Sequence, residues 1–441
     1  MRVVIAASVA GTWLLATGPP ALLTVAQRDD VRSVRAPRTI DVSADGRLVA
    51  FESLARLVPA DTDDSRDIYV LDRTTRLVSL ESEGPGDGSE HSHPRISGDG
   101  RYLVFESRPS QNMNTPRADI VLRDRIAGTS RVLTATARNL HPYGWSRDPD
   151  ISADGRVVAF SSAATTLTDG LDVNGAVEDI YLVHVASGAI SRASVTSAGV
   201  QPDRGESILP SLSADGRWVA FASTAPLDDA PLAVGSNLDK RPRQVYLRDT
   251  IDGRTTRITR AANGGVPNGT SWLPSLSADG RRVAFASDAS NLRDDDHNRA
   301  ADVFLYDRET DAITWVSRAA DGSSAGGEST GPVISGNGRF IAFQSDAANL
   351  VCAKRCSEHA DDINLLWDTF LFDSANGVIV RTSEDELGGW MEPSVGPALD
   401  ATGQMVAFSS RHPVDAADRD GDFDLFVRAL MPPPISTRRS P

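Results

Sequence analysis

The sequence predicts an all-β fold, a seven-bladed β-propeller made of four-stranded antiparallel blades. Three observations support this prediction. A phrase of the type Ser-Ala-Asp-Gly-Arg, followed by a short apolar run, occurs seven times along the chain. Each copy is followed by two further strand-like segments, and no helical periodicity lies between the copies. Such units cannot bury both faces alone, so neighbouring units must stack around a ring.

The recurring phrase is expected to form a tight turn between two strands. Glycine adopts a positive φ at little cost, and aspartate hydrogen-bonds the turn backbone. The turn glycines are Gly46, Gly100, Gly155, Gly216, Gly280, Gly338 and Gly403.

The second repeat shows the four expected strands most clearly. Residues 93–97 form a short extended piece, and residues 101–107 form a buried strand after the turn. Residues 119–125 and 130–136 supply the third and fourth strands. The four together predict an antiparallel meander.

The two ends of the repeat region are expected to meet. The last repeat reaches its third strand at 424–430 and then runs into Met-Pro-Pro-Pro. Residues 31–35 resemble a fourth strand such as residues 255–260. We therefore expect residues 31–35 to complete the last blade and close the ring, which removes exposed sheet edges. The propeller would span residues 31–430, followed by a disordered tail over 431–441.

The N-terminus has the pattern of a secretory signal peptide over residues 1–26. Met1-Arg2 precedes an apolar run, and cleavage is expected near Ala26. This pattern predicts a secreted, periplasmic or cell-envelope protein without a stable membrane span after cleavage. An uncleaved membrane anchor is the alternative, although Gly18-Pro19-Pro20 interrupts the apolar run.

Composition narrows the class of ligand. The net charge of −15 argues against nucleic acid, because phosphate binding needs a basic surface. The only cysteines are Cys352 and Cys356. In an exported protein such a close pair is expected to form a local disulfide; a redox-active pair and a metal-binding pair are the alternatives.

The phrase at residues 43–47, followed by Asp67-Ile-Tyr-Val-Leu-Asp72, resembles the TolB-type, WD40-like propeller repeats. The resemblance covers about residues 31–430 and implies the propeller fold. In that family a proline often stands where this chain has alanine or glycine. The family's separate α/β domain has no counterpart here, so the resemblance implies neither the Tol role nor a peptidase activity.

Long loops between the second and third strands carry a shared acidic pattern. Alternating Asp and Asn oxygens suit Ca²⁺, so these loops are candidate calcium sites; the alternative is that the aspartates cap turns. The candidate ligands are Asp61, Asp63, Asp67, Asp296, Asn298, Asp302, Asp362, Asn364, Asp368, Asp418, Asp420, Asp422 and Asp424, and the third repeat has a related set in Asp172, Asn174 and Asp179.

Two further sets of side chains are weaker candidates. Trp145, Trp272 and Trp390 precede first strands and would either stack on a ligand or pack between blades. His91 and His93 would either pair on a metal or lie in a solvated loop.

No catalytic motif is present: the chain lacks the nucleophile elbow, the zinc-protease helix, the phosphate loop and the dinucleotide fingerprint. We therefore expect no catalytic residues and a monomeric binding or scaffolding module. Its ligand would be a protein or a cell-envelope glycan, met on the long-loop face. The alternative is a hydrolase or lyase that acts on polysaccharide through channel carboxylates. Carboxylates that converge with an Arg or His at the channel would favour the enzyme.

Overall fold

A computed structural model describes residues 21–22, 39–82, 88–108, 117–135, 144–228, 241–351, 366–383, 393–411 and 423–430. These residues form strands and turns without any helix, which confirms the all-β prediction. It follows that no membrane-crossing helix is found among them.

The strands form five four-stranded sheets and one eight-stranded sheet within the described residues. The first repeat contains β2 (Ile40–Val42), β3 (Leu48–Ser53), β4 (Asp67–Asp72) and β5 (Leu77–Leu80). The second and third repeats contain β6 (Glu90–Ile96), β7 (Tyr102–Arg108), β8 (Arg117–Asp124), β9 (Thr129–Val132), β10 (Gly144–Ile151), β11 (Val157–Ser162), β12 (Asp179–His184) and β13 (Ala189–Arg192). A short parallel pairing of β8 with β10 joins these two antiparallel meanders.

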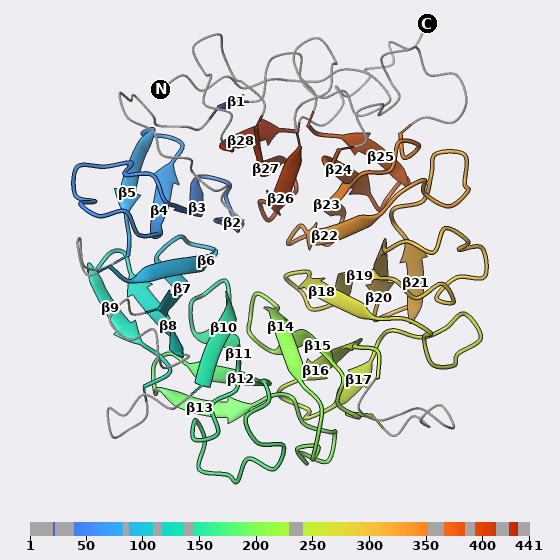
Figure 1. Ribbon diagram of the computed structural model, residues 1–441, viewed down its shortest axis with the longest axis horizontal. Helices are drawn as coiled ribbons and strands as arrows, with labels where there is room; N and C mark the ends of the chain where they lie inside the picture. Colours follow the sequence, from blue (N-terminus) through green and yellow to red (C-terminus); the bar gives the residue numbers. More distant parts are fainter. Residues whose placement is uncertain are drawn as a thin grey trace, which may run out of the picture.

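The remaining repeats follow the same plan. The fourth and fifth contain β14 (Ser207–Leu212), β15 (Trp218–Ser223), β16 (Gln244–Asp249), β17 (Thr255–Arg257), β18 (Ser271–Leu276), β19 (Arg282–Ser287), β20 (Asp302–Asp307) and β21 (Ala312–Trp315). The sixth and seventh contain β22 (Ser329–Ile334), β23 (Phe340–Ser345), β24 (Asp368–Asp373), β25 (Val378–Arg381), β26 (Ser394–Leu399), β27 (Met405–Ser410) and β28 (Asp424–Ala429). Figure 1 shows the sheets arranged around a common centre, with the first strand of each repeat innermost.

Aromatic pairs form the core of the sheets. The phenylalanine that ends each Val-Ala-Phe run is buried, as Phe160 and Phe285 show with no exposed surface. In most repeats this ring stacks on an aromatic ring of the third strand, with Phe160 and Tyr181 at 5.8 Å between centroids. In the second repeat His91 takes this role and meets Phe105 edge-on at 5.4 Å. The phrase thus specifies the packing between strands as well as the turn.

The Asp-Gly turns hydrogen-bond to one another around the centre. Each turn donates a backbone N–H to the next turn, as Ala153 does to the carbonyl oxygen of Ala214 at 2.9 Å. The donor is the alanine or glycine of the phrase, except in the sixth repeat, where it is Asn337. The last of these bonds runs from Ala401 to Ala44, at 3.1 Å. In TolB-type repeats a proline often stands at the position of this alanine or glycine, and proline has no N–H to donate. The alanine therefore permits the hydrogen bond between neighbouring turns.

The arginine of the phrase pairs with the aspartate that ends the third strand. The pairs are Arg47 with Asp72, Arg101 with Asp124, Arg217 with Asp249, Arg281 with Asp307, and Arg339 with Asp373, at 2.6 to 2.8 Å. The third repeat differs because β12 ends on His184, and Arg156 lies instead 3.4 Å from Asp154. These pairs tie the short turn to the strand beside it.

A short strand from the N-terminal region completes the seventh repeat. β1 (Ala21–Leu22) pairs antiparallel with β28 through Val427 and Phe426, where other repeats have their fourth strand. Residues 31–35, which we expected there, lie outside the described residues, as do both cysteines, the predicted cleavage site and the tail. β1 falls inside the predicted signal peptide. A molecule that has lost this peptide therefore cannot contain β1.

Candidate functional site

A central pocket of about 560 Å³ is lined by first-strand residues from all seven repeats. Most of these first strands contain a β-bulge. In each bulge the residue that precedes a proline has a positive φ. This residue is His93 in β6 (φ 54°) and Asp148 in β10 (φ 53°). Because a bulge redirects a side chain, the bulges turn these residues toward the axis.

The pocket has two chemically different walls. The polar wall comes from the first three repeats and presents Asp41, His93, Arg95, Asp148 and Asp150. The opposite wall comes from the later repeats and is mostly apolar: Leu209, Pro210, Leu273, Pro274, Gly331, Pro332, Gly396 and Pro397.

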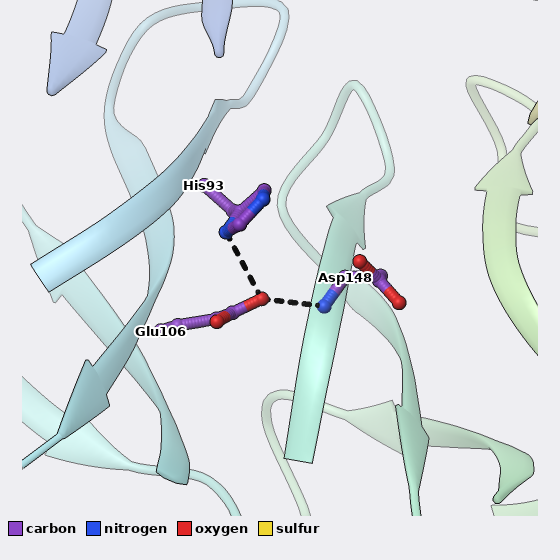
Figure 2. Close-up of side chains that lie close together, drawn as sticks. All are labelled: His93, Glu106 and Asp148. Atoms are coloured by element: carbon purple, nitrogen blue, oxygen red, sulfur yellow. Dashed lines mark hydrogen bonds and ion pairs between the residues drawn. The ribbon is translucent and has the colours of Figure 1, made fainter. Parts of the chain in front are cut away.

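Behind the polar wall, the buried Glu106 lies close to His93 and Asp148, and Figure 2 shows these three side chains together. Glu106 lies in β7 with 1% of its side chain exposed, and its Oε1 is 3.2 Å from Nδ1 of His93. The same oxygen accepts the backbone N–H of Asp148 at 2.8 Å. The Asp148 carboxylate accepts a hydrogen bond from Ser161 Oγ at 3.0 Å. One oxygen of Glu106 therefore connects the second and third repeats.

Charge is distributed unevenly in this cluster. Burial alone would lower the pKa of His93, but the contact with Glu106 outweighs burial and raises it. Burial would raise the pKa of Glu106, but His93 holds it below its ordinary value. The pKa of Asp148 is raised by burial and by the nearby Glu106. These shifts favour a protonated His93 beside an ionised Glu106, and they make the Asp148 carboxyl easier to protonate than an ordinary one.

A second polar group lies deeper along the same wall. Arg95 is 4.0 Å from Asp41, and the pKa of Asp150 is raised to about 6 by burial, which Arg95 opposes. Asp150 also accepts the backbone N–H of Leu212 at 2.6 Å. These carboxylates therefore serve both the pocket and the contact between repeats.

Two groups of described residues bring three potential metal ligands within 4.8 Å of one another. One is His93, Glu106 and Asp148, and the other is Asp61, Asp63 and Asp67 of the first loop. In the loop, Asp61 accepts the Tyr69 hydroxyl and Asp63 accepts the Ser65 backbone N–H at 2.8 Å. Donors of the chain thus already occupy oxygens of the loop.

The aspartates that open the third strands act as hydrogen-bond acceptors for the fourth strands. Asp67, Asp302 and Asp368 each accept a serine hydroxyl, at 2.6 to 2.7 Å. These aspartates thus have a structural role, which differs from the turn capping named as the alternative to metal binding. Asp424 begins β28. The remaining predicted ligands, Asp362, Asn364, Asp418, Asp420 and Asp422, lie outside the described residues.

Of the predicted tryptophans, the two within the described residues, Trp145 and Trp272, do not line the central pocket. Trp145 is 36% exposed and has Arg108 stacked over it at 4.8 Å. Trp272 is half-buried in β18, and Trp390 lies outside the described residues. His91 and His93 share β6, yet His91 faces the core and His93 faces the pocket, so they do not form a pair.

The long-loop face, where we expected a ligand, has a groove of about 490 Å³ in the third repeat. Leu171, Val173 and Val200 line it and are 84%, 47% and 59% exposed.

Sequence reasoning did not single out Glu106, Asp148 or Arg95. Glu106 stands where most other repeats have a small residue, such as Ser161 or Ala286, although the first and sixth repeats have Glu52 and Gln344 there. The carboxylate of Glu106 within an otherwise apolar strand was the sequence signal for this site. It becomes visible when the repeats are aligned.

Comparison with protein-family models gives no match, and neither does comparison with curated proteins. Solved structures do match. Oligogalacturonate lyase from Vibrio parahaemolyticus is 14% identical, with a TM-score of 0.54 and 93% of each chain covered. An oligogalacturonate lyase in complex with manganese is 13% identical, with a TM-score of 0.53 over 95% of this chain and 99% of the other.

A third match concerns a propeller named as such. The β-propeller domain of the Trilobed protease from Pyrococcus furiosus, which has an open velcro topology, is 12% identical. Its TM-score is 0.53, over 91% of this chain and 99% of that one. The fold is a β-propeller. The propeller fold that the resemblance to TolB-type repeats implies is therefore confirmed.

Proposed function

We propose that the protein is an exported binding module whose ligand, a cell-envelope glycan, occupies the central pocket. The observation that carries this proposal is the contrast between the two pocket walls. Asp41, Arg95 and Asp150 offer donors and acceptors for hydroxyl groups, and the facing leucines and prolines offer a surface for the C–H face of a sugar ring. A few placed polar groups on a mostly apolar concave surface are typical of small-ligand sites.

The architecture that supports this function is proposed to be a seven-bladed ring closed by the N-terminal segment. The hydrogen bond from the seventh turn to the first supports this arrangement, as does the pairing of β1 with β28. Packing of Ile40 and Val42 against Met405 and Leu425 also supports it. Export rests on the N-terminal sequence pattern.

Calorimetric titration of the purified chain with neutral, amino-sugar and uronic-acid oligosaccharides of envelope glycans tests the binding proposal. We expect one of these classes to bind, and D41N/D150N to weaken that binding at least about tenfold, the cost of about one lost hydrogen bond. D154N, on an exposed turn away from the pocket, serves as the control. Absence of binding by all three classes, or equal binding by D41N/D150N, would refute the proposal.

A polysaccharide lyase or hydrolase is the second candidate, because His93 and Glu106 form a proton-transfer pair beside Asp148. Two propellers of similar fold are named as oligogalacturonate lyases, one of them in complex with manganese. The imidazole and two carboxylates of this cluster fit the ligand preferences of such an ion, which would supply a Lewis acid. Release of unsaturated products from polygalacturonate, lost in H93A, would support a lyase.

A further inference from the structure

The long loop of the fifth repeat, between β19 and β20, holds two buried carboxylates close together. Asp296 is 6% exposed and Asp302 is fully buried. Asp302 accepts Ser317 Oγ at 2.7 Å and the Asn298 side-chain amide at 3.0 Å. The same amide donates to the carbonyl oxygen of Ala325 at 3.3 Å. Oδ1 of Asp296 is buried without any hydrogen-bond partner in the described part of the chain.

No arginine or lysine of the described residues pairs with either carboxylate. The nearby Arg293 and Arg318 pair instead with Asp295, at 3.4 and 2.7 Å. Burying a carboxylate without a neighbouring positive charge is costly. A cation bound between these oxygens would therefore stabilise the loop.

The third repeat shows how the same loop is satisfied without a metal. Arg192 lies 3.3 Å from Asp172 and 3.2 Å from Asp179. The side-chain amide of Gln201 donates to the same two carboxylates, at 3.0 and 2.8 Å. The chain's own side chains thus fill the space between the aspartates.

Two further repeats also balance this position, whereas the first repeat has Leu80 at the place of Arg192. Arg381 lies 3.7 Å from Asp368 in the sixth repeat, and the fourth repeat has the neutral Gln244 in place of the aspartate. In the fifth repeat Trp315 occupies the place that Arg192 has in the third, since each pairs with the third residue of its neighbouring strand. The fifth repeat therefore keeps the aspartates and lacks the arginine.

We propose that this loop binds Ca²⁺ through Asp296, Asn298 and Asp302. The ligands would be carboxylate and amide oxygens, which a hard cation prefers. The buried Oδ1 of Asp296 would gain its missing partner. Asn298 would present its amide oxygen after the amide turns over, which ends its present hydrogen bonds with Asp302, Ala325 and Ala300. The third repeat's loop is expected not to bind, because Arg192 and Gln201 already neutralise it. This site is separate from the central pocket, so its test does not depend on whether the pocket binds a glycan.

Thermal melting of the full chain, first in EDTA and then in excess CaCl₂, tests the proposal. At about 100 times Kd, binding stabilises the fold by about 2.7 kcal/mol, a rise in melting temperature of about 3 °C. D296N keeps the side-chain shape and should lose the Ca²⁺-dependent rise. D172N is the matched control in the third repeat and should keep it. Absence of a rise in the unchanged protein, or a full rise in D296N, would overturn the proposal.

Terbium luminescence provides a readout that does not depend on stability. Trp315 Nε1 donates to Ser317 Oγ at 3.3 Å, and Ser317 donates to Asp302, so Trp315 lies beside the proposed site. Tb³⁺ in this loop should luminesce when tryptophan is excited, and Ca²⁺ should quench the signal by competition. W315F should reduce the signal severalfold and keep the Ca²⁺-dependent melting shift. An unchanged signal in W315F would place the ion elsewhere and overturn the assignment.

Discussion

The backbone N–H of Asp148 donates a hydrogen bond to Glu106 across two neighbouring repeats, at 2.8 Å. The same contact recurs where Glu52 accepts the N–H of His93 at 3.0 Å, and where Gln344 accepts that of Gly396 at 3.3 Å. In each case a second-strand side chain holds the bulge of the next repeat. The residues that shape the polar wall of the pocket are therefore also structural.

This contact predicts different effects for two substitutions of Glu106. E106A would leave the buried N–H of Asp148 unpaired and lower the free energy of unfolding by about 1–3 kcal/mol. E106Q would keep an acceptor, as Gln344 does in the sixth repeat, and should cost less than half as much. Urea denaturation measures both. Equal losses in the two variants would show that the charge, and not the hydrogen bond, is what stabilises the bulge.

The Arg–Asp pairs of the short turns predict acid sensitivity. The hydrogen bond from Arg101 lowers the pKa of Asp124 to about 2, and Arg47 does the same for Asp72. A carboxyl with a lowered pKa binds its proton less readily in the folded state. Its stabilisation is therefore present above about pH 4 and is lost as the pH falls to about 2.

R101M should thus shift the acid unfolding midpoint to higher pH. R156M is the matched control, because the third repeat ends its third strand on His184 and offers Arg156 no such partner. Circular dichroism between pH 5 and pH 2 would follow both variants, over a range set by the ordinary and lowered carboxyl pKa values. A similar shift in both variants would contradict the pairing argument.

The fold was predictable from the sequence because it repeats. The Asp-Gly turns, the Val-Ala-Phe runs and the third-strand aspartates recur at matching places, so each copy supports the interpretation of the others. The site was not predictable in this way. His93, Glu106 and Asp148 are residues in which the copies differ, and they meet only because a bulge turns His93 and Asp148 toward the axis. The acidic loops could be found from their sequence pattern. The pattern could not show that Arg192 neutralises the aspartates of the third repeat, whereas those of the fifth have no such partner among the described residues.

Contact between repeats predicts that the turn glycines differ in their tolerance of alanine. Gly280 has φ +67°, and a Cβ there would lie 2.2 Å from Cδ1 of Trp218 in the preceding repeat. Gly253 has a similar φ, +71°, and open space around it. G253A should cost about 1 kcal/mol for the left-handed backbone alone. G280A should cost about 1–3 kcal/mol more, because the indole must move. Equal costs by chemical denaturation would show that Trp218 yields freely.

The proposed closure of the ring predicts that the N-terminal segment stabilises the seventh repeat. β28 pairs on its outer side with Ala21–Leu22, and an exposed edge strand would be left if this partner were removed. A chain without residues 1–36 should therefore melt at a lower temperature than the full chain. Removal of residues 431–441 is the control and should have no effect.

A third truncation, without residues 1–26, separates the two candidate closing strands. A loss equal to that of the longer deletion would assign closure to Ala21–Leu22, because residues 31–35 would still be present. Full stability would assign it to residues 31–35 and would fit removal of the predicted signal peptide. If the chain without residues 1–36 melts like the full chain, the propeller does not depend on an N-terminal strand, and its seventh repeat is stable with three strands.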